Sequence, residues 1–585
     1  MSEVALPPGW PAMSIAEAHR LLTAPGTPTE VVETVIRGVT FRTFKNLPPT
    51  FGDMVEHARN FGERVFLVYE DERVTYEAFY RACAAIAREL QAQGVGKGDR
   101  VAIVMRNLPE WVAAFYGTMA IGAVATPLNA WWTGPELEYG FKDSGAKVAL
   151  VDAERYARMA EHLHNLSDLK RIYVARADEE IAHPAVVALE SVIGAPAAWA
   201  GLPDQRLPKV DVAPDDLATL LYTSGTTGSP KGALGTHRGG MTNVFTGAVA
   251  TARNFLRRGE TPPAPDPTLQ RATLISVPFF HVTGSIALLN PHVYAGAKIV
   301  MMRRWDPLRA FQLIERERIN TAGGVPTIAW QLIEHPERTN YDLSSLETVN
   351  YGGAPSAPEL VRKIRETFPN AQPGNGWGMT ETTGTMTVHS AEDYLNRPDS
   401  CGPPTPVADL KIVDPVDGVT VLPPGQVGEL WAKGPHVASG YWNKPEATAA
   451  AFVDGWVRTG DLARLDEEGF CFIIDRAKDM LIRGGENIYC IEVENRLYDH
   501  PAVMDAAVVG RPHRTLGEEP VAVVKLKPDT VATEAELRAH VAQHLAAFKV
   551  PVEIRFSPDI LPRNANGKIL KRELRAWFED ETPSA

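Results

Sequence analysis

The chain has 585 residues, a formal net charge of −13 at pH 7 and 44% hydrophobic residues. This length is too great for a single hydrophobic core, so we expect two or more domains, and the ordinary hydrophobic fraction is typical of a soluble globular protein. The excess of negative charge argues against a nucleic-acid-binding protein.

The chain ends and the cysteines favour a cytoplasmic protein. The first eleven residues are mildly acidic and proline-rich, unlike a secretory signal, and the last residues carry no peroxisomal tripeptide. The four cysteines have no spacing typical of a zinc site or a disulfide framework: Cys83, Cys401, Cys471 and Cys490. We therefore expect buried or incidental thiols in a reducing compartment.

The uncharged stretch of residues 111–131 is long enough to raise the question of a membrane span. It is rich in Ala, Gly and Thr and is interrupted by Pro127. This composition predicts a buried helix followed by a strand, and no integral membrane segment.

From about Thr75 onward, apolar strand-like runs alternate with amphipathic helical runs, which is typical of βαβ units and mostly parallel sheets. The clearer strands are residues 101–105, 148–151, 272–277 and 298–302. After the last of these, Asp306 can cap a helix that has Pro307 in its first turn. A second helix is predicted at Ser356, where Glu359 completes a capping box.

The composition of the sequence changes near Cys401, where Pro, Gly and Val become frequent. This composition predicts short strands joined by turns. Further on we expect strands at 506–509 and 521–526, a helix opening with Thr533 and Glu536, another strand, and a final helix from about Ile569. The predicted fold is α/β. It has a large N-terminal domain of parallel-rich sheets (1–477), including a β-rich subdomain at about 401–475, and a small α+β C-terminal domain (478–585).

A loop at residues 222–232 packs small hydroxyls, glycines and one lysine into eleven positions. Glycines let the backbone approach an anion closely, hydroxyls and N–H groups donate to phosphate oxygens, and Lys231 supplies positive charge. The loop is not a Walker A motif, because Lys231 follows Pro230 and precedes Gly232. A polyphosphate site is the functional interpretation, and an ordinary Gly/Ser/Thr loop is the structural alternative.

Four further stretches carry residues suited to a nucleotide. In the first, small residues follow Tyr351, and Trp377 offers a stacking face just before Thr380 and Glu381, which can bind a phosphate and Mg²⁺. The second contains Asp461, which can accept both ribose hydroxyls. The third and fourth are residues 475–488 and 562–569.

These five stretches, in this order, resemble the signature motifs of the adenylate-forming (AMP-binding) superfamily, which includes acyl-CoA synthetases, adenylation domains of peptide synthetases and luciferases. The resemblance covers about residues 48–577. The family usually has tyrosine where this chain has Trp377. By this resemblance the ATP/AMP site consists of Thr223, Ser224, Gly225, Thr226, Thr227, Gly228, Lys231, Gly353, Ala354, Pro355, Trp377, Gly378, Met379, Thr380, Asp461 and Arg476.

The resemblance also implies the remaining roles. Lys568 would bridge the carboxylate and the α-phosphate, with Thr380, Glu381 and His281 as the other catalytic residues, while Glu381 and Thr226 would bind the metal. Lys478 would be the hinge of a mobile C-terminal domain. The CoA channel would be lined by His281, Gly484 and Gly485. The acyl pocket would be lined by Phe280, His281, Gly323, Gly324, Val325, Gly353 and Met379.

The function implied is that of an ATP-dependent acyl-CoA synthetase that uses ATP, Mg²⁺ and coenzyme A. Apolar residues around the expected acyl pocket favour a medium- or long-chain fatty acid or an aryl acid over acetate. The resemblance also disfavours amino acids, because amino-acid-activating relatives generally place an aspartate near the position of His281 to pair with the substrate ammonium, and this stretch has none. Three alternatives stay open: an adenylation enzyme that loads a carrier protein, a luciferase-like oxygenase, and a nucleotide-binding regulator. The sequence leaves a homodimer open.

Overall fold

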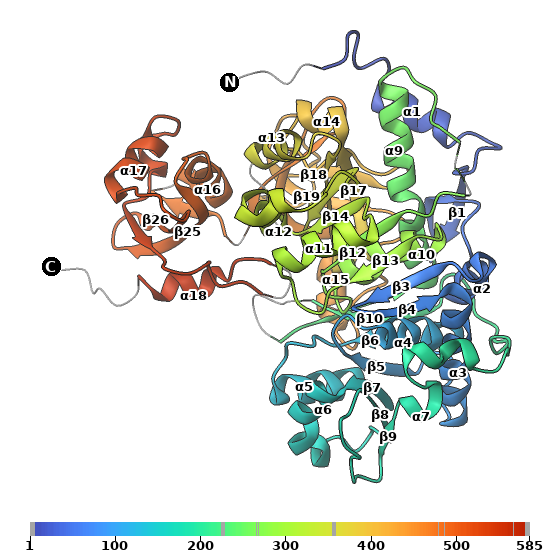
Figure 1. The fold of residues 1–585 in the computed structure, drawn as a ribbon. Helices are drawn as coiled ribbons and strands as arrows, with labels where there is room; N and C mark the ends of the chain where they lie inside the picture. The colour runs from blue at the N-terminus through green and yellow to red at the C-terminus, as the bar shows by residue number, and fades with distance from the viewer. Residues whose placement is uncertain are drawn as a thin grey trace.

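The structure is a computed structural model that describes residues 6–223, 229–264, 266, 268–353, 358–477, 479–484, 486–564 and 567–578. Figure 1 shows a large body that contains two long sheets, and a separate C-terminal lobe beside it. The mixed α/β class predicted from the sequence is confirmed.

The first long sheet has the strand order β11-β10-β6-β5-β7-β8-β9 and is parallel except where β10 meets β11. Its strands are β5 (Arg100–Val104), β6 (Val124–Pro127), β7 (Val148–Asp152), β8 (Arg171–Ala175), β9 (Val186–Ala188), β10 (Leu217–Tyr222) and β11 (Gly232–Thr236). The antiparallel pair at its edge brackets the predicted phosphate loop.

The second long sheet has the order β17-β16-β15-β14-β12-β13-β3-β4 and is parallel except at its two edge pairs. Its strands are β3 (Val65–Tyr69), β4 (Glu72–Thr75), β12 (Ala272–Ile275), β13 (Lys298–Met301), β14 (Thr321–Gly324), β15 (Thr348–Gly352), β16 (Gln372–Met379) and β17 (Gly384–Ser390). Strand β12 is two residues shorter than predicted, because Pro278 follows and cannot donate to a ladder.

Helices α3 (Tyr76–Ala92) and α4 (Pro109–Ala120) belong to the core of the large body. Every residue of α4 is buried, as expected for a helix that is largely apolar, and its carboxylate, Glu110, pairs with Arg176 at 2.8 Å. Helix α4 and strand β6 thus confirm the buried helix and strand predicted for 111–131. Among the described residues, no helix combines the length and apolarity that crossing a membrane requires.

Three helices flank the second sheet: α11 (Pro307–Glu317), α12 (Pro326–Glu334) and α13 (Pro358–Thr367). The Asp306 side chain accepts a hydrogen bond from the Arg309 amide at the start of α11, and Pro307 is the first helical residue, as predicted. The predicted cap of α13 at Ser356 lies outside the described residues.

An antiparallel sheet follows, with the order β18-β19-β21-β20 and β22 paired to β21. Its strands are β18 (Asp409–Val413), β19 (Gly428–Lys433), β20 (Phe452–Val453), β21 (Trp456–Leu465) and β22 (Cys471–Arg476). They lie within the stretch expected to form the β-rich subdomain.

The C-terminal lobe contains the sheet β24-β23-β26-β25, to which β27 adds in parallel. Its elements are β23 (Leu481–Arg483), β24 (Glu486–Ile488), α16 (Cys490–Tyr498), β25 (Val503–His513), β26 (Gly517–Leu526), α17 (Glu534–Ala542), β27 (Glu553–Phe556) and α18 (Lys571–Ala576). Thr533 and Glu536 form the predicted capping box. Helix α18 begins two residues later than predicted, because Ile569 pairs with Arg563 as a β-bridge.

Candidate active site

A cavity of about 970 Å³ lies between the large body and the C-terminal lobe. It brings together residues that are up to several hundred positions apart in the sequence. The predicted site residues that line it are Thr223, Phe280, His281, Gly353, Trp377, Gly378, Asp461, Arg476 and Lys568.

Asp461, on β21, is held by two donors at one end of this cavity. The indole N–H of Trp377 donates to Oδ2 at 2.9 Å, and the guanidinium of Arg476 pairs with Oδ1 at 3.0 Å. The carboxylate is buried, with 4% of the residue exposed. The sequence interpretation treated Trp377 only as a stacking surface. The structure adds a second role, because the indole N–H fixes the carboxylate expected to bind the ribose.

Glu381, in the turn after β16, accepts a hydrogen bond from the hydroxyl of Tyr441 at 2.7 Å. Burial raises the pKa of Glu381, and the Tyr441 hydroxyl and the charge of Arg476 oppose this shift. The ring of Tyr441 also lies below the Lys231 ammonium, 5.2 Å from the ring centroid. Tyr441 was missed from the sequence.

The predicted phosphate loop is anchored at both ends. The Thr223 amide donates to the Lys231 carbonyl at 2.8 Å, and the hydroxyl of Tyr139 donates to the Pro230 carbonyl at 2.8 Å. Ser224, Gly225, Thr226, Thr227 and Gly228 lie outside the described residues, as do Ala354 and Pro355.

His281 precedes the π-helical segment Thr283–Leu289 and is buried against Phe280, with ring centroids 4.5 Å apart. Burial lowers the pKa of His281 to about 3, so the imidazole is neutral at physiological pH. Its Nε2 atom is buried without a protein hydrogen-bond partner. A purely structural core histidine would be expected to bond the backbone through its ring, so the unpartnered Nε2 in the cavity wall favours a ligand contact.

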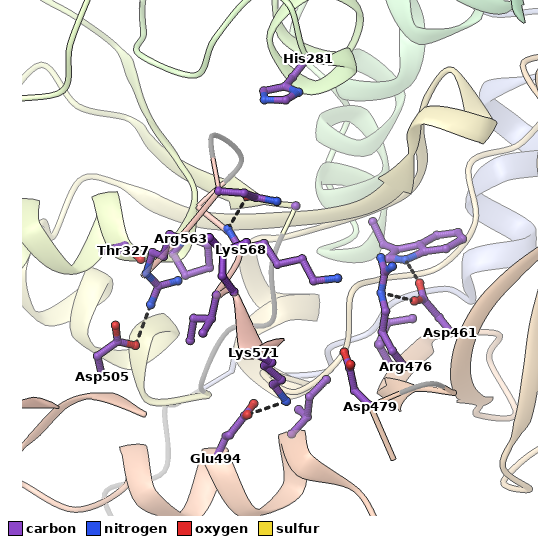
Figure 2. A pocket seen from close by; sticks show the side chains of 18 of the residues that line it. His281, Thr327, Asp461, Arg476, Asp479, Glu494, Asp505, Arg563, Lys568 and Lys571 are labelled. Carbon is purple, nitrogen blue, oxygen red and sulfur yellow. Dashed lines mark hydrogen bonds and ion pairs between the residues drawn. The ribbon is translucent and has the colours of Figure 1, made fainter. Parts of the chain in front are cut away.

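Lys568 lines the cavity and follows Gly567, whose amide donates a hydrogen bond to the Asn564 carbonyl at 2.9 Å. Arg563 holds Gly567 in place, because it donates to the Gly567 carbonyl at 2.6 Å and pairs with Asp505 at 2.7 Å. Figure 2 shows the Lys568 side chain extending toward the Asp461–Arg476 pair.

The three glycines assigned to the acyl pocket differ in their surroundings. A Cβ at Gly323 would lie 1.8 Å from the Asn350 carbonyl oxygen, so this glycine is explained by close packing of β14 on β15. A Cβ at Gly324 would meet Val277 at 2.9 Å, whereas one at Gly353 would meet nothing within 4 Å. Of the three, only Gly353 faces open space.

The CoA-channel and hinge residues are only partly covered by the structure. Gly484 lies between β23 and β24 with φ of +62°, and it is not among the residues lining the cavities described here. Gly485 and Lys478 lie outside the described residues. Val325, which was assigned to the acyl pocket, packs against the lobe: a Cβ on Gly567 would lie 2.9 Å from its Cγ2 atom.

A buried charged cluster, also missed from the sequence, joins β22 to the lobe. The Asp475 carboxylate accepts a hydrogen bond from the Cys490 amide at the start of α16, and Lys571 pairs with Glu494 at 2.7 Å (Figure 2). Burial raises the pKa of Asp475 to about 6, although the Lys571 charge acts in the opposite direction. Asp475 and Cys490 lie on opposite sides of position 478, so this contact joins the large body to the lobe across the predicted hinge position.

A second cavity, of about 870 Å³, adjoins the first. The residues that line both are Trp131, Phe280, Thr327, Gln331, Arg563 and Asn564. Its lining is strongly basic, with one carboxylate, that of Glu154. The arginines that line it are Arg106, Arg155, Arg158, Arg303, Arg304 and Arg563. Burial and the neighbouring cations lower the pKa of Arg106 to about 10. Arg155, Arg158 and Arg303 pair with Glu154 and Arg563 pairs with Asp505, and the positive charges still outnumber the lining carboxylate among the described residues.

Comparison with known proteins places this site in a family. The sequence model of the family described as "AMP-binding enzyme" matches residues 54–442, and that of "AMP-binding enzyme C-terminal domain" matches residues 492–568. A long-chain-fatty-acid–CoA ligase of Bacillus subtilis (strain 168) is 32% identical over 547 residues, covering 90% of this chain and 94% of the relative.

Two further matches cover nearly the whole chain. A feruloyl-CoA synthase of Amycolatopsis sp. is 35% identical over 506 residues, covering 86% of this chain and 94% of the relative. The crystal structure of the anthranilate CoA ligase AuaEII in complex with anthranoyl-AMP superimposes with a TM-score of 0.79 at 26% identity, covering 91% of this chain and 97% of that one. The chain therefore belongs to the AMP-binding enzymes, in the group of AMP-forming acyl- and aryl-CoA ligases.

Proposed function

We propose that one cavity of this protein serves both half-reactions of an ATP-dependent CoA ligase. In the first, a carboxylate oxygen of the acid attacks the α-phosphorus of ATP and pyrophosphate leaves, which gives an acyl-adenylate. In the second, the sulfur of CoA attacks the acyl carbonyl carbon and AMP leaves. The observation that carries the proposal is that Lys568 of the lobe lines one cavity with Trp377 and Asp461 of the large body.

The nucleotide would lie along the Trp377–Asp461–Arg476 end of the cavity. The indole face of Trp377 would stack on adenine, and the Asp461 carboxylate would accept the ribose hydroxyls. Lys568 would place its positive charge between the attacking carboxylate and the α-phosphate, where negative charge develops. Thr380 and the loop around Lys231 would bind the phosphates.

The residues present fit a magnesium ion brought with the nucleotide. No group of three or more His, Cys, Asp or Glu side chains that could hold a metal occurs in the described part of the chain. Mg²⁺ in nucleotide sites needs only one or two carboxylates, because phosphates and water supply the other ligands. Glu381 would provide that carboxylate, with Thr226 as the second predicted ligand. When bound, the ion would neutralise charge on the phosphates.

The acid would lie on the opposite side, beside Phe280 and His281. Trp131 and Trp330 add aromatic surface to the cavity wall, and the neutral imidazole of His281 offers one polar contact. This lining suits a medium- or long-chain fatty acid or an aryl acid. The names of the relatives, a long-chain-fatty-acid–CoA ligase and a feruloyl-CoA synthase, support the same range.

CoA would enter through the second cavity. CoA carries three phosphate groups, and arginine is well suited to phosphate because its planar guanidinium can donate two parallel hydrogen bonds. The arginine-lined cavity adjoins the first at Phe280, so a thiol on an extended arm could reach the acyl carbonyl. Residues 478–585 would form a mobile domain hinged at Lys478, which removes Lys568 between the two half-reactions.

The test is to incubate the protein with ATP, Mg²⁺ and one of octanoate, palmitate, benzoate, cinnamate or acetate, with and without CoA. We expect AMP and acyl-CoA to form with an apolar acid and not with acetate. Acid-dependent exchange of pyrophosphate into ATP without CoA-dependent turnover would instead indicate a carrier protein as acceptor. Absence of exchange with every acid would contradict the proposed function.

A further inference from the structure

A short segment after β19, residues 438–442, joins the phosphate-loop strand to the turn that carries Glu381. The Ala438 amide donates to the Glu381 carbonyl at 2.8 Å. On the other side the segment runs along β11, with the Leu234 amide donating to the Gly440 carbonyl at 3.0 Å and the Trp442 amide donating to the Gly232 carbonyl at 2.8 Å. The backbone of this segment therefore fixes the distance between two parts of the site.

Tyr441 lies at the centre of this segment, and its side chain contacts both parts. Its hydroxyl donates to Glu381 Oε1 at 2.7 Å, while its ring lies 5.2 Å from the Lys231 ammonium. The residue has little freedom to move. Its amide donates to the Thr448 hydroxyl oxygen at 2.9 Å, and its ring packs edge-on against Phe452 at 5.4 Å.

These contacts suit a role for Tyr441 in positioning Glu381 and Lys231, in addition to its packing against Phe452. A hydrogen bond from a phenol to one carboxylate oxygen fixes the rotation of the carboxylate and favours its ionised form. The negative face of an aromatic ring attracts an ammonium and restrains a long, flexible side chain. One residue thus contacts both a carboxylate that the proposed function assigns to the metal ion and an ammonium that it assigns to the ATP phosphates.

We propose that Tyr441 is a positioning residue that sets Glu381 for the metal ion through its hydroxyl and Lys231 for the phosphates through its ring. The inference rests on the proposed function, since it takes Glu381 as the magnesium ligand. The two halves of the proposal make different predictions. Loss of the hydroxyl weakens the metal-dependent part of ATP binding, and loss of the ring weakens the metal-independent part as well.

The experiment measures the dissociation constant of ATP by titration calorimetry, once in excess Mg²⁺ and once in EDTA, with no acid or CoA present. The metal effect is the ratio of the two constants. In Tyr441→Phe, which keeps the ring, we expect the metal effect to fall about tenfold and the constant in EDTA to stay unchanged. In Tyr441→Leu we expect the constant in EDTA to rise a few-fold in addition.

Two further variants make the result decisive. Tyr80→Phe removes a similar hydroxyl, which donates to Glu56 at 2.6 Å away from the site, and it is expected to bind ATP like the unaltered protein. Glu381→Gln tests the metal ligand itself. A full metal effect in Tyr441→Phe together with its loss in Glu381→Gln would overturn the role of Tyr441 and leave the proposed function standing.

A full metal effect in Glu381→Gln would remove Glu381 as the ligand and with it the role of Tyr441. Equal weakening in Tyr80→Phe and Tyr441→Phe would show a general loss of stability and would also refute the proposal. The conservative Tyr441→Phe variant retains the packing against Phe452. It therefore tests the role of the hydroxyl even if Tyr441→Leu does not fold.

Discussion

Replacing Gly567 with alanine is expected to separate the two half-reactions. Gly567 has φ of +71°, and an added Cβ would lie 2.9 Å from Cγ2 of Val325 and 3.2 Å from two more of its atoms. The left-handed backbone costs an L-residue about 1–2 kcal/mol in any orientation of the lobe. In the proposed two-orientation cycle, the clash with Val325 would arise only in the orientation of the lobe described here.

The free-energy cost of this clash depends on how easily the Val325 side chain can move away. Val325 is β-branched, so its side chain has few alternative rotamers, and overpacking of this kind costs about 1–3 kcal/mol. At about 1.4 kcal/mol per factor of ten, the docked orientation becomes about 5- to 150-fold less populated. We expect acyl-adenylate formation to fall by this factor, whereas thioester formation from supplied acyl-adenylate changes little.

The assay compares ATP–pyrophosphate exchange with acyl-CoA formation from supplied acyl-adenylate. Val325→Ala removes the atoms that clash, so the double variant is expected to recover exchange to the level of Val325→Ala alone. The single Val325 variant is the necessary control, because this residue is also predicted to line the acyl pocket. Equal loss in both half-reactions, or no recovery in the double variant, would refute the reasoning.

Three other changes have defined outcomes. Lys568→Ala should abolish acyl-adenylate formation and spare thioester formation from supplied acyl-adenylate; equal loss of both would exclude the assigned role. Trp377→Phe keeps a ring for adenine but loses the N–H that holds Asp461, so the dissociation constant of ATP should rise about tenfold, and an unchanged constant would contradict this. Because the pKa of Asp475 is raised to about 6 from about 3.9 in an unfolded chain, the unfolded state ionises first and stability falls by about 2 kcal/mol as pH rises from 4 to 6. Asp475→Asn should flatten this fall in thermal unfolding curves, and identical pH slopes would argue against it.

Four strands of the two long sheets, predicted at 101–105, 148–151, 272–277 and 298–302, were located to within two residues, because buried parallel strands are continuous apolar runs. The start of α11 was predictable for a similarly local reason, since Asp306 and Pro307 act within one helical turn. Both signals depend only on neighbouring residues, so the sequence is enough to read them.

The contacts that organise the site could not be predicted in this way. Tyr441 bonds a carboxylate 60 positions away, and Trp377 bonds one 84 positions away. Such pairs leave no periodic signal in the sequence, because neither partner changes the local pattern. Gly323 was assigned to the acyl pocket because a glycine leaves room for a ligand. In the structure, the Asn350 carbonyl of the adjacent strand occupies the position that its side chain would take.

The ion pair between Lys527 of the lobe and Glu334 of α12 makes the protein sensitive to ionic strength. Their charged atoms are 3.1 Å apart, and about 30% of each side chain is exposed. An ion pair this open contributes about 0–1 kcal/mol and weakens as salt shortens the Debye length. If the lobe alternates between two orientations as proposed, ionic strength would act on their balance, and a rise in salt would favour release of the lobe at this edge without any change in the chemistry of the cavity.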